Sequence, residues 1–266
     1  MKPRVVKPQV IKSGITKAVR LIALAMLAGL FASVSSAQQM TLAAASSLRP
    51  ALDYVVEAYQ DIHTDHQVSV IYGSSGRLTA QIINDAPFDF FMSADMAYPQ
   101  RLVDEGYAAS EPRVYAWGRL VLWSADLDAS GLTLRDLVDG AIERIAIAQP
   151  EIAPYGQRTR EAMQATGIWS QVQHKLVFGE NISQVTQMAQ SGAADVGLIA
   201  LSLAVQPGLA STGFYLIDAA LHEPLEQGFV ITRRGADNDV AKAFSRFLAT
   251  PAARAIFRDN GFDVDD

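Results

Sequence analysis

The sequence predicts an α/β fold of two lobes, and three observations support this. Short apolar runs of strand length alternate with amphipathic stretches of helix length from residue 40 to residue 260. Several of the apolar runs end in small residues, often serine or glycine, and a helix-like stretch follows at once. Residues 38–266 are numerous enough for two lobes of ordinary domain size, and half of the chain is apolar, which is enough for a core in each.

The first 37 residues have the three parts of a signal peptide. Six basic residues and no acidic residue precede an apolar run at 21–34, and Ser35-Ser36-Ala37 then offers a small-residue cleavage site. The alternative is an uncleaved membrane anchor, but the apolar run is shorter than the roughly 20 residues that span a bilayer. We expect cleavage after Ala37.

Charge and cysteine content narrow the possible partners. Loss of residues 1–37 would move the formal net charge from −6 to −12, which makes nucleic acid and anionic membranes poor partners. The absence of cysteine excludes disulfides and a lipid-anchoring thiol. These features predict a soluble exported protein of the periplasm.

In the first half of the chain, two strands each lead through serines into a helix. A strand at 40–45 is followed by Ser46-Ser47 and a helix to Tyr59. A strand at 68–72 is followed by Gly73-Ser74-Ser75-Gly76 and a helix to Ile83. Buried strands are then expected at 88–92 and 118–123, and a short helix at 132–137.

The second half continues the alternation. Strands are expected at 145–148, 175–178, 196–200 and 229–232, and helices at 159–166, 182–191, 240–249 and 252–260. The apolar segments at 118–123 and 228–232 are candidates for crossings between lobes. We therefore expect one lobe of residues 38–117 plus 233–266 and a second of residues 118–232.

Four helix starts after strands, at Ser47, Ser75, Tyr155 and Ile182, are the features that point to a function. In an open α/β sheet, ligands bind beyond the carboxyl ends of the strands, where helix N-termini present N–H groups and a partial positive charge. Such a place binds an anion without any lysine or arginine. The alternative is that Ser47 and Ser75 only cap their own helices.

Six segments together resemble one known family, although each alone is a weak signal. The sequence is similar to the periplasmic molybdate-binding proteins of ABC transporters, which have the two-lobed type II solute-binding fold. The matching segments cover essentially the whole chain after residue 39: Ala43 through Leu48, Gly73 through Leu78, Asp89 through Asp95, Pro150 through Gly156, Gly179 through Ile182, and Phe257 through Phe262.

The resemblance implies a fold, a ligand and a set of binding groups. Each lobe is expected to be a mixed sheet flanked by helices, with molybdate or tungstate in the cleft between lobes. The family holds its dianion through two serine side chains and main-chain N–H groups, which correspond here to Ser47, Ser75, Tyr155 and Ile182. Ser46 is the alternative to Ser47, because the alanine run permits a shift of one residue. Molybdenum is expected only as this oxyanion, with no direct metal-ligand side chain and no cofactor.

One donor of some family members is missing. A tyrosine of the second lobe reaches the anion in those members, and the matching position here is Ala200. The resemblance therefore implies either one donor fewer or a replacement such as the N–H of Ser46.

These donors suit a fully ionised oxyanion. Molybdate, tungstate and sulfate offer only acceptors at neutral pH, whereas phosphate keeps a proton that needs an acceptor. The expected function is capture of molybdate or tungstate and delivery to a membrane ABC permease by a monomer that is not an enzyme.

Three other functions are alternatives to the binding of molybdate or tungstate. A binding protein for sulfate or an organic acid would have the same fold. A serine hydrolase using Ser47 or Ser75 lacks a Gly-x-Ser-x-Gly motif and a histidine placed to activate the serine. A purely structural domain does not explain serines at successive helix starts. Asp89 and Asp95 are expected to cap turns or join the lobes.

Overall fold

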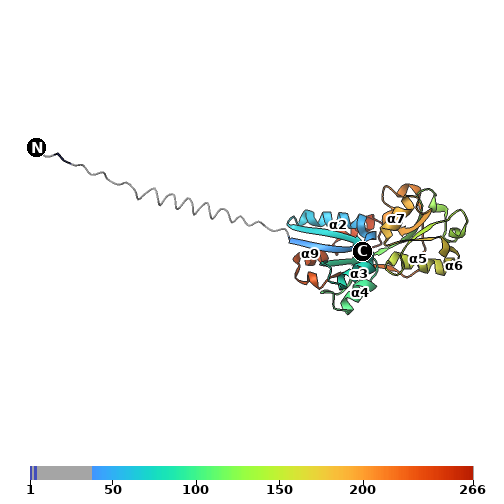
Figure 1. The fold of residues 1–266 in the computed structure, drawn as a ribbon, viewed down its shortest axis with the longest axis horizontal. Helices are drawn as coiled ribbons and strands as arrows, with labels where there is room; N and C mark the ends of the chain where they lie inside the picture. Colours follow the sequence, from blue (N-terminus) through green and yellow to red (C-terminus); the bar gives the residue numbers. More distant parts are fainter. Residues whose placement is uncertain (2, 5–37, 266) are drawn as a thin grey trace. The chain divides into compact units, whose positions relative to one another are not determined.

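The computed structural model describes residues 1, 3–4 and 38–265. The expected signal peptide lies outside the described residues apart from residues 1, 3 and 4. Residues Ala37–Asp266 form one compact unit, which contains two five-stranded sheets (Figure 1). The expected fold class, two mixed sheets flanked by helices, is confirmed.

The first sheet has the strand order β2-β1-β3-β10-β4. Strand β1 pairs in parallel with β2 and β3, while β10 runs antiparallel to β3 and β4. The strands are β1 (Gln38–Ala45), β2 (His66–Gly73), β3 (Phe90–Ser93), β4 (Arg113–Gly118) and β10 (Leu225–Ile231).

The second sheet has the order β7-β6-β8-β5-β9. Here β6 is parallel to β7 and β8, and β5 is antiparallel to β8 and β9. The strands are β5 (Leu120–Trp123), β6 (Ile145–Ala148), β7 (Leu176–Gly179), β8 (Val196–Ala200) and β9 (Phe214–Leu216). The two sheets thus share one pattern, in which three parallel strands begin at one edge and two strands joined by antiparallel pairing complete the other side.

Helices connect the strands and cover the sheets (Figure 1). The α-helices are α2 (Arg49–Ile62), α3 (Ser75–Ile83), α4 (Ala97–Asp104), α5 (Pro154–Ala165), α6 (Trp169–Val172), α7 (Ile182–Gln190), α8 (Leu201–Ala204), α9 (Asp239–Phe247) and α10 (Pro251–Asp259). The 3₁₀ turns are η1 (Ser46–Leu48), η2 (Ala129–Gly131), η3 (Leu134–Val138), η4 (Gln173–Lys175), η5 (Ala210–Thr212), η6 (Ala219–Leu221) and η7 (Arg234–Asp237).

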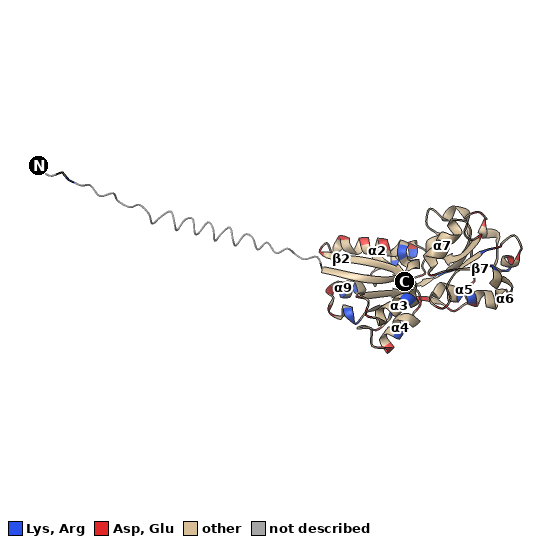
Figure 2. Cartoon of the chain, in the orientation of Figure 1, with Lys and Arg blue, Asp and Glu red and all other residues tan. Residues whose placement is uncertain are grey.

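Helix α2 shows how the sequence pattern sets the packing. Leu52, Val55 and Tyr59 are fully buried in the hydrophobic core. Asp53, Glu57 and Asp61 recur every four residues on the exposed face, which appears as the row of acidic residues along α2 in Figure 2. Spacing along the helix therefore separates the core from the solvent.

The chain passes between the sheets twice. β4 ends at Gly118 and β5 begins at Leu120, so the first passage lies inside the segment where a crossing was expected. The second lies between β9 and β10, because β10 pairs with β3 and β4 of the first sheet. The expected boundary at residue 232 is therefore too late. We keep the division into lobes as a proposal and place its second boundary at residues 217–224.

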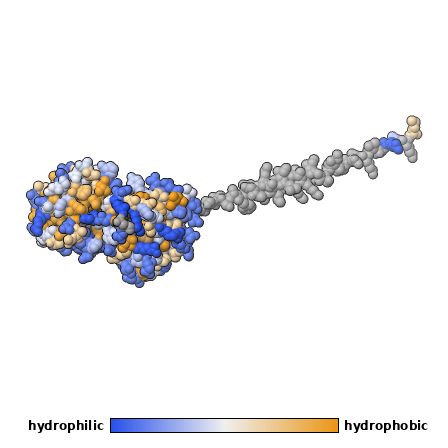
Figure 3. All heavy atoms as spheres, turned by 180° about the vertical axis from the view of Figure 1, so that it is seen from behind, coloured by the Kyte–Doolittle hydropathy of each residue, from blue (hydrophilic) through white to orange (hydrophobic). Residues whose placement is uncertain are grey.

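Among the described residues, no helix is long and apolar enough to cross a membrane. On the face shown in Figure 3, exposed apolar residues lie in groups interrupted by hydrophilic ones.

Candidate functional site

The five residues predicted to bind a ligand line one pocket. Ser46, Ser47, Ser75, Tyr155 and Ile182 lie around the same small space. The pocket lies beyond the carboxyl ends of β1, β2, β6 and β7, where η1, α3, α5 and α7 begin. Its other lining residues are small or apolar: Ala45, Gly73, Ser74, Ala94, Ala153 and Pro154.

The alternative that these serines only cap helices is wrong for both. Ser75 is the first residue of α3, and the N-cap position belongs to Ser74, whose side chain makes no capping hydrogen bond. Ser47 lies inside η1, and the N-cap of α2 is Leu48. Neither serine is placed to satisfy the N–H groups of its own helix in the usual way.

The Ser75 hydroxyl keeps its proton available for a ligand. Its Oγ accepts a hydrogen bond from the Ala94 N–H at 3.1 Å, and the side chain is buried. A hydroxyl that accepts one bond still has its own hydrogen to donate. Ser75 can therefore act as a donor toward the pocket.

Ser46 and Ser47 form hydrogen bonds with two different helices, α7 and α8. Ser46 Oγ accepts from the Ser183 N–H at 3.3 Å, and Ser183 Oγ donates to the Ser46 carbonyl at 3.1 Å. The Ser47 carbonyl accepts from Ser202 Oγ at 2.8 Å. Ser47 Oγ itself is buried and makes no hydrogen bond within the described residues. Both serines remain candidate donors.

Tyr155 and Ile182 present main-chain N–H groups in first helical turns, where no intrahelical acceptor exists. Pro154 begins α5 and has no N–H, so Tyr155 carries the first N–H of that helix. At α7, the Asn181 side chain accepts from Gln184 N–H and leaves the N–H of Ile182 uncapped by that side chain.

Gly156 sets how closely α5 approaches the second sheet. A Cβ at this position would lie 2.0 Å from the carbonyl oxygen of Ala148, the last residue of β6. Only glycine permits this contact, which brings the first turn of α5, and with it Tyr155, down to the end of the strand.

The pocket is neutral in its side chains. None of its described lining residues is lysine, arginine, aspartate or glutamate. Burial raises the pKa of the Tyr155 phenol well above its usual value, and the adjacent Ser47 hydroxyl lowers it in part, so the phenol keeps its proton at neutral pH. Helix N-termini and hydroxyl groups are the sources of positive potential here.

Two ion pairs join the two sides of the pocket. Arg158 of α5 forms a buried pair with Asp95, which also accepts from the Ala97 N–H. Arg77 of α3 pairs with Glu180 at 2.5 Å on the exposed side. Asp89 accepts from the Thr41 N–H at 2.8 Å within the first sheet. The structural roles expected for Asp89 and Asp95 are confirmed.

Two hydroxyl groups of the site are not predicted by the sequence. Ser74 lines the pocket with a buried hydroxyl that makes no hydrogen bond within the described part of the chain. The sequence predicts a role only for the Tyr155 N–H, but the Tyr155 hydroxyl is also buried and makes no hydrogen bond within the described residues. Ala200 is fully buried at the end of β8 and does not line the pocket. The residue pair Ser74-Ser75 was a signal for Ser74, but no local signal existed for the phenol.

The chain matches known proteins over nearly its full length. Residues 40–263 match the family model of bacterial extracellular solute-binding proteins. A molybdate-binding protein of Rhodobacter capsulatus is 36% identical over 259 residues, which cover 96% of this chain and 97% of that protein. One of Azotobacter vinelandii is 32% identical over 248 residues, covering 91% and 97%.

Solved structures agree on the architecture. The periplasmic molybdate-binding protein of Azotobacter vinelandii superposes with a TM-score of 0.80 at 31% identity, covering 85% of this chain and all of that one. The sulfate-binding protein SubI of Mycobacterium tuberculosis has a TM-score of 0.74 at 15% identity, covering 86% and 88%, and shows the shared fold alone.

Proposed function

Because the chain belongs to the family of bacterial extracellular solute-binding proteins, we propose that it binds molybdate, and tungstate as a close analogue, for delivery to an ABC permease. The observation that carries this proposal is a pocket of hydroxyl and N–H donors without a carboxylate. The two relatives with the highest identity quoted above are named for molybdate binding. The proposed ligand groups are the hydroxyls of Ser47 and Ser75 and the N–H groups of Tyr155 and Ile182, with Ser46 as the alternative to Ser47.

The donor set explains why phosphate is a poor ligand. Molybdate offers only acceptors, whereas the remaining proton of phosphate would lack a carboxylate acceptor in this pocket. An unpaired polar contact in a buried site costs about 1–3 kcal/mol. Four to seven hydrogen bonds to a charged ligand contribute roughly 1.5–3 kcal/mol each, and association takes back several kcal/mol. A dissociation constant of about micromolar to nanomolar follows.

Binding is proposed to involve closure of the two lobes. Ser47 and Ser75 belong to the first sheet's side, and Tyr155 and Ile182 to the second. The Gly76 N–H donates to the Ile152 carbonyl at 2.9 Å between these sides, next to the pocket. A ligand held from both sides stabilises the arrangement in which the sides meet.

Calorimetric titration tests the ligand. We expect one molybdate per chain, and thermal-shift competition should rank molybdate and tungstate above sulfate and phosphate. Strong sulfate binding with no response to molybdate would identify a binding protein for a different solute.

Ser75→Ala is expected to weaken molybdate binding by about 1.5–3 kcal/mol, the usual value of a hydrogen bond to a charged group, without unfolding the protein. The measurement is calorimetric titration of the purified variant. Ser69→Ala, an exposed serine on β2, is the matched control and should bind as the parent does. Equal molybdate affinity of the parent and Ser75→Ala would show that the Ser75 hydroxyl does not bind the ligand and only accepts the hydrogen bond from the Ala94 N–H.

The remaining parts of the proposal concern location and chemistry. We propose export by residues 1–37, a periplasmic monomer, no cofactor, no nucleic-acid partner and no enzymatic activity. The four histidines are absent from the lining of the pocket, and His66 bonds to Tyr59 instead. Labelling of Ser47 or Ser75 by a serine-directed phosphonate would contradict the absence of hydrolase chemistry.

A further inference from the structure

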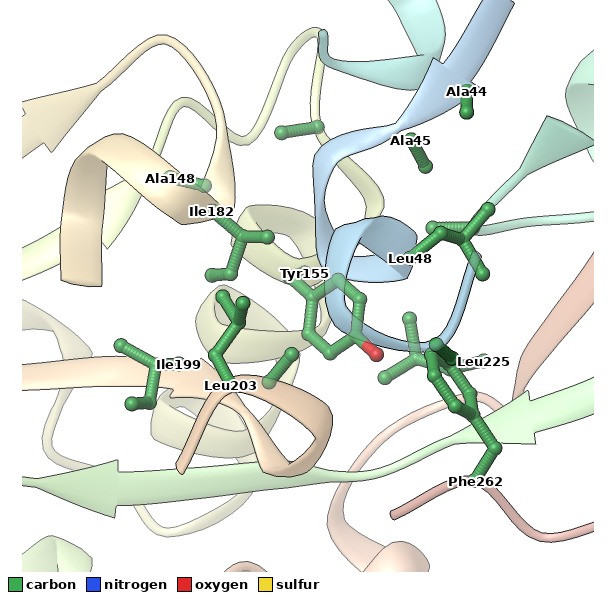
Figure 4. Close-up of a cluster of buried hydrophobic side chains, with 14 of the residues drawn as sticks. Ala44, Ala45, Leu48, Ala148, Tyr155, Ile182, Ile199, Leu203, Leu225 and Phe262 are labelled. Carbon is green, nitrogen blue, oxygen red and sulfur yellow. The ribbon is translucent and has the colours of Figure 1, made fainter. Parts of the chain in front are cut away.

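The side chain of Tyr155 is a second, unused polar group at the pocket. Its ring lies among apolar side chains that include Leu48, Leu203 and Leu225, and its hydroxyl is directed away from Ile182 (Figure 4). The residue is only 2% exposed, and its hydroxyl makes no hydrogen bond within the described residues. A buried hydroxyl without a partner is destabilising, and most buried hydroxyls in proteins have one.

Gly118 and Gln227 lie next to the phenol oxygen. A Cβ on Gly118 would lie 2.3 Å from the Tyr155 hydroxyl oxygen and 2.8 Å from Gln227 Nε2, so Gly118 leaves the space that both groups use. Gln227 Nε2 donates to the carbonyls of Ala94 and Leu225 at 3.3 and 3.2 Å, which fixes the orientation of the amide. Both hydrogens of the amide nitrogen are used in these bonds, and a nitrogen donor cannot accept the phenol proton. The amide oxygen, Gln227 Oε1, makes no hydrogen bond within the described residues.

Ser47 is another neighbour of the phenol. Its Oγ is also buried and makes no hydrogen bond within the described chain, and it is close enough to the Tyr155 hydroxyl to lower the pKa of the phenol. Two unpaired hydroxyls side by side satisfy each other when one rotates its hydrogen toward the other. Because Ser47 lines the pocket, the direction of that bond decides what the serine offers a ligand.

We propose that the Tyr155 hydroxyl donates to Ser47 Oγ and thereby orients the Ser47 hydroxyl hydrogen toward the bound oxyanion. This inference rests on the proposed function. It makes Tyr155 a positioning residue through its side chain, in addition to the donor role proposed for its N–H.

Two of the other three pocket serines have the same arrangement, which supports the proposal. Ser75 Oγ accepts from the Ala94 N–H and Ser46 Oγ accepts from the Ser183 N–H. Each hydroxyl that accepts a bond from the protein has its own hydrogen left for the ligand. With Tyr155 as donor, Ser47 follows the same rule, and a group from α5 acts on a serine that follows β1.

Tyr155→Phe tests the proposal, because it keeps the ring and the main-chain N–H and removes only the hydroxyl. We expect molybdate affinity to fall by about 3- to 10-fold, the range for loss of one neutral hydrogen bond. In a Ser47→Ala background the same change should have no further effect, since no hydroxyl remains to orient. The four proteins of this double-mutant cycle are compared by calorimetric titration.

Tyr59→Phe is the matched control. Tyr59 is a buried tyrosine outside the pocket, and its hydroxyl bonds to His66 Nδ1 at 2.6 Å. Its loss should lower the melting temperature and leave molybdate affinity unchanged. The melting temperature of each variant without molybdate is measured first, and titrations are run well below it.

The outcomes separate the two proposals. A parent protein that does not bind molybdate would contradict the proposed function itself. A parent that binds, with equal affinity in Tyr155→Phe, would overturn only the role of the phenol. An equal loss with and without the Ser47 hydroxyl would overturn it as well, because it would show an effect of packing.

Discussion

Arg158→Met is expected to lower the free energy of unfolding by about 3–5 kcal/mol, the cost of leaving a buried charge without its partner. The side chains of Arg158 and Asp95 are 8% and 12% exposed, so water compensates little for the missing charge. Arg158 also donates to the Pro224 carbonyl and to Glu161, and both bonds are lost with it. Chemical denaturation of the protein without molybdate measures the change.

An exposed pair gives the matched control. Arg77 and Glu180 also join the two sides of the pocket, but their side chains are 55% and 63% exposed. Arg77→Met should therefore cost less than about 1 kcal/mol. Adding Asp95→Asn to Arg158→Met should recover part of the loss, since the unpaired carboxylate is then removed. Similar effects of Arg77→Met and Arg158→Met would contradict the importance of burial.

Gly156→Ala is expected to destabilise the protein by about 1–3 kcal/mol, although alanine in place of glycine usually stabilises a helix by about 1 kcal/mol. The sign reverses because the new Cβ would lie 2.0 Å from the Ala148 carbonyl oxygen, and α5 must shift to make room. The Tyr155 N–H shifts with it, so molybdate affinity should fall by roughly tenfold or more, the value of one hydrogen bond to a charged ligand.

Denaturation and calorimetric titration together check this prediction. Gly140→Ala is the control, because a Cβ there has no heavy atom within 4 Å and the backbone is not in the left-handed region. It should leave both stability and affinity close to those of the parent. A stabilised Gly156→Ala protein with normal affinity would show that the close approach of α5 to β6 is not required.

The sequence predicted elements where a local pattern carried the information. The starts of α3 and α7 follow from a strand, small or polar residues and a helical apolar stripe. Helix α5 begins at Pro154, one residue before the helix start predicted at Tyr155, whereas the apolar pattern predicted only residues 159–166, because the first turn has no apolar stripe. Proline at a first helical position was the available signal. No local pattern indicated the partners of strand β10, because β3 and β4 are more than 100 residues away in sequence.

The site divides in the same way. Residues at helix starts could be chosen from the sequence, since the carboxyl ends of strands meet at one edge. The pairs Ser46–Ser183 and Arg158–Asp95, and the position of the Tyr155 hydroxyl beside Ser47, join residues far apart in the chain. Such contacts depend on how the two sheets pack together, and no periodic pattern in the sequence predicts them.

The main-chain donors also affect how this protein can change through evolution. Any residue except proline supplies an N–H at position 182, so replacement of Ile182 need not remove its donor. The neighbours that place the backbone, Pro154, Gly156 and Asn181, are under the stronger constraint. Two homologues with different residues at position 182 could therefore capture the same solute, and at that position the backbone setting is more informative than the identity of the residue.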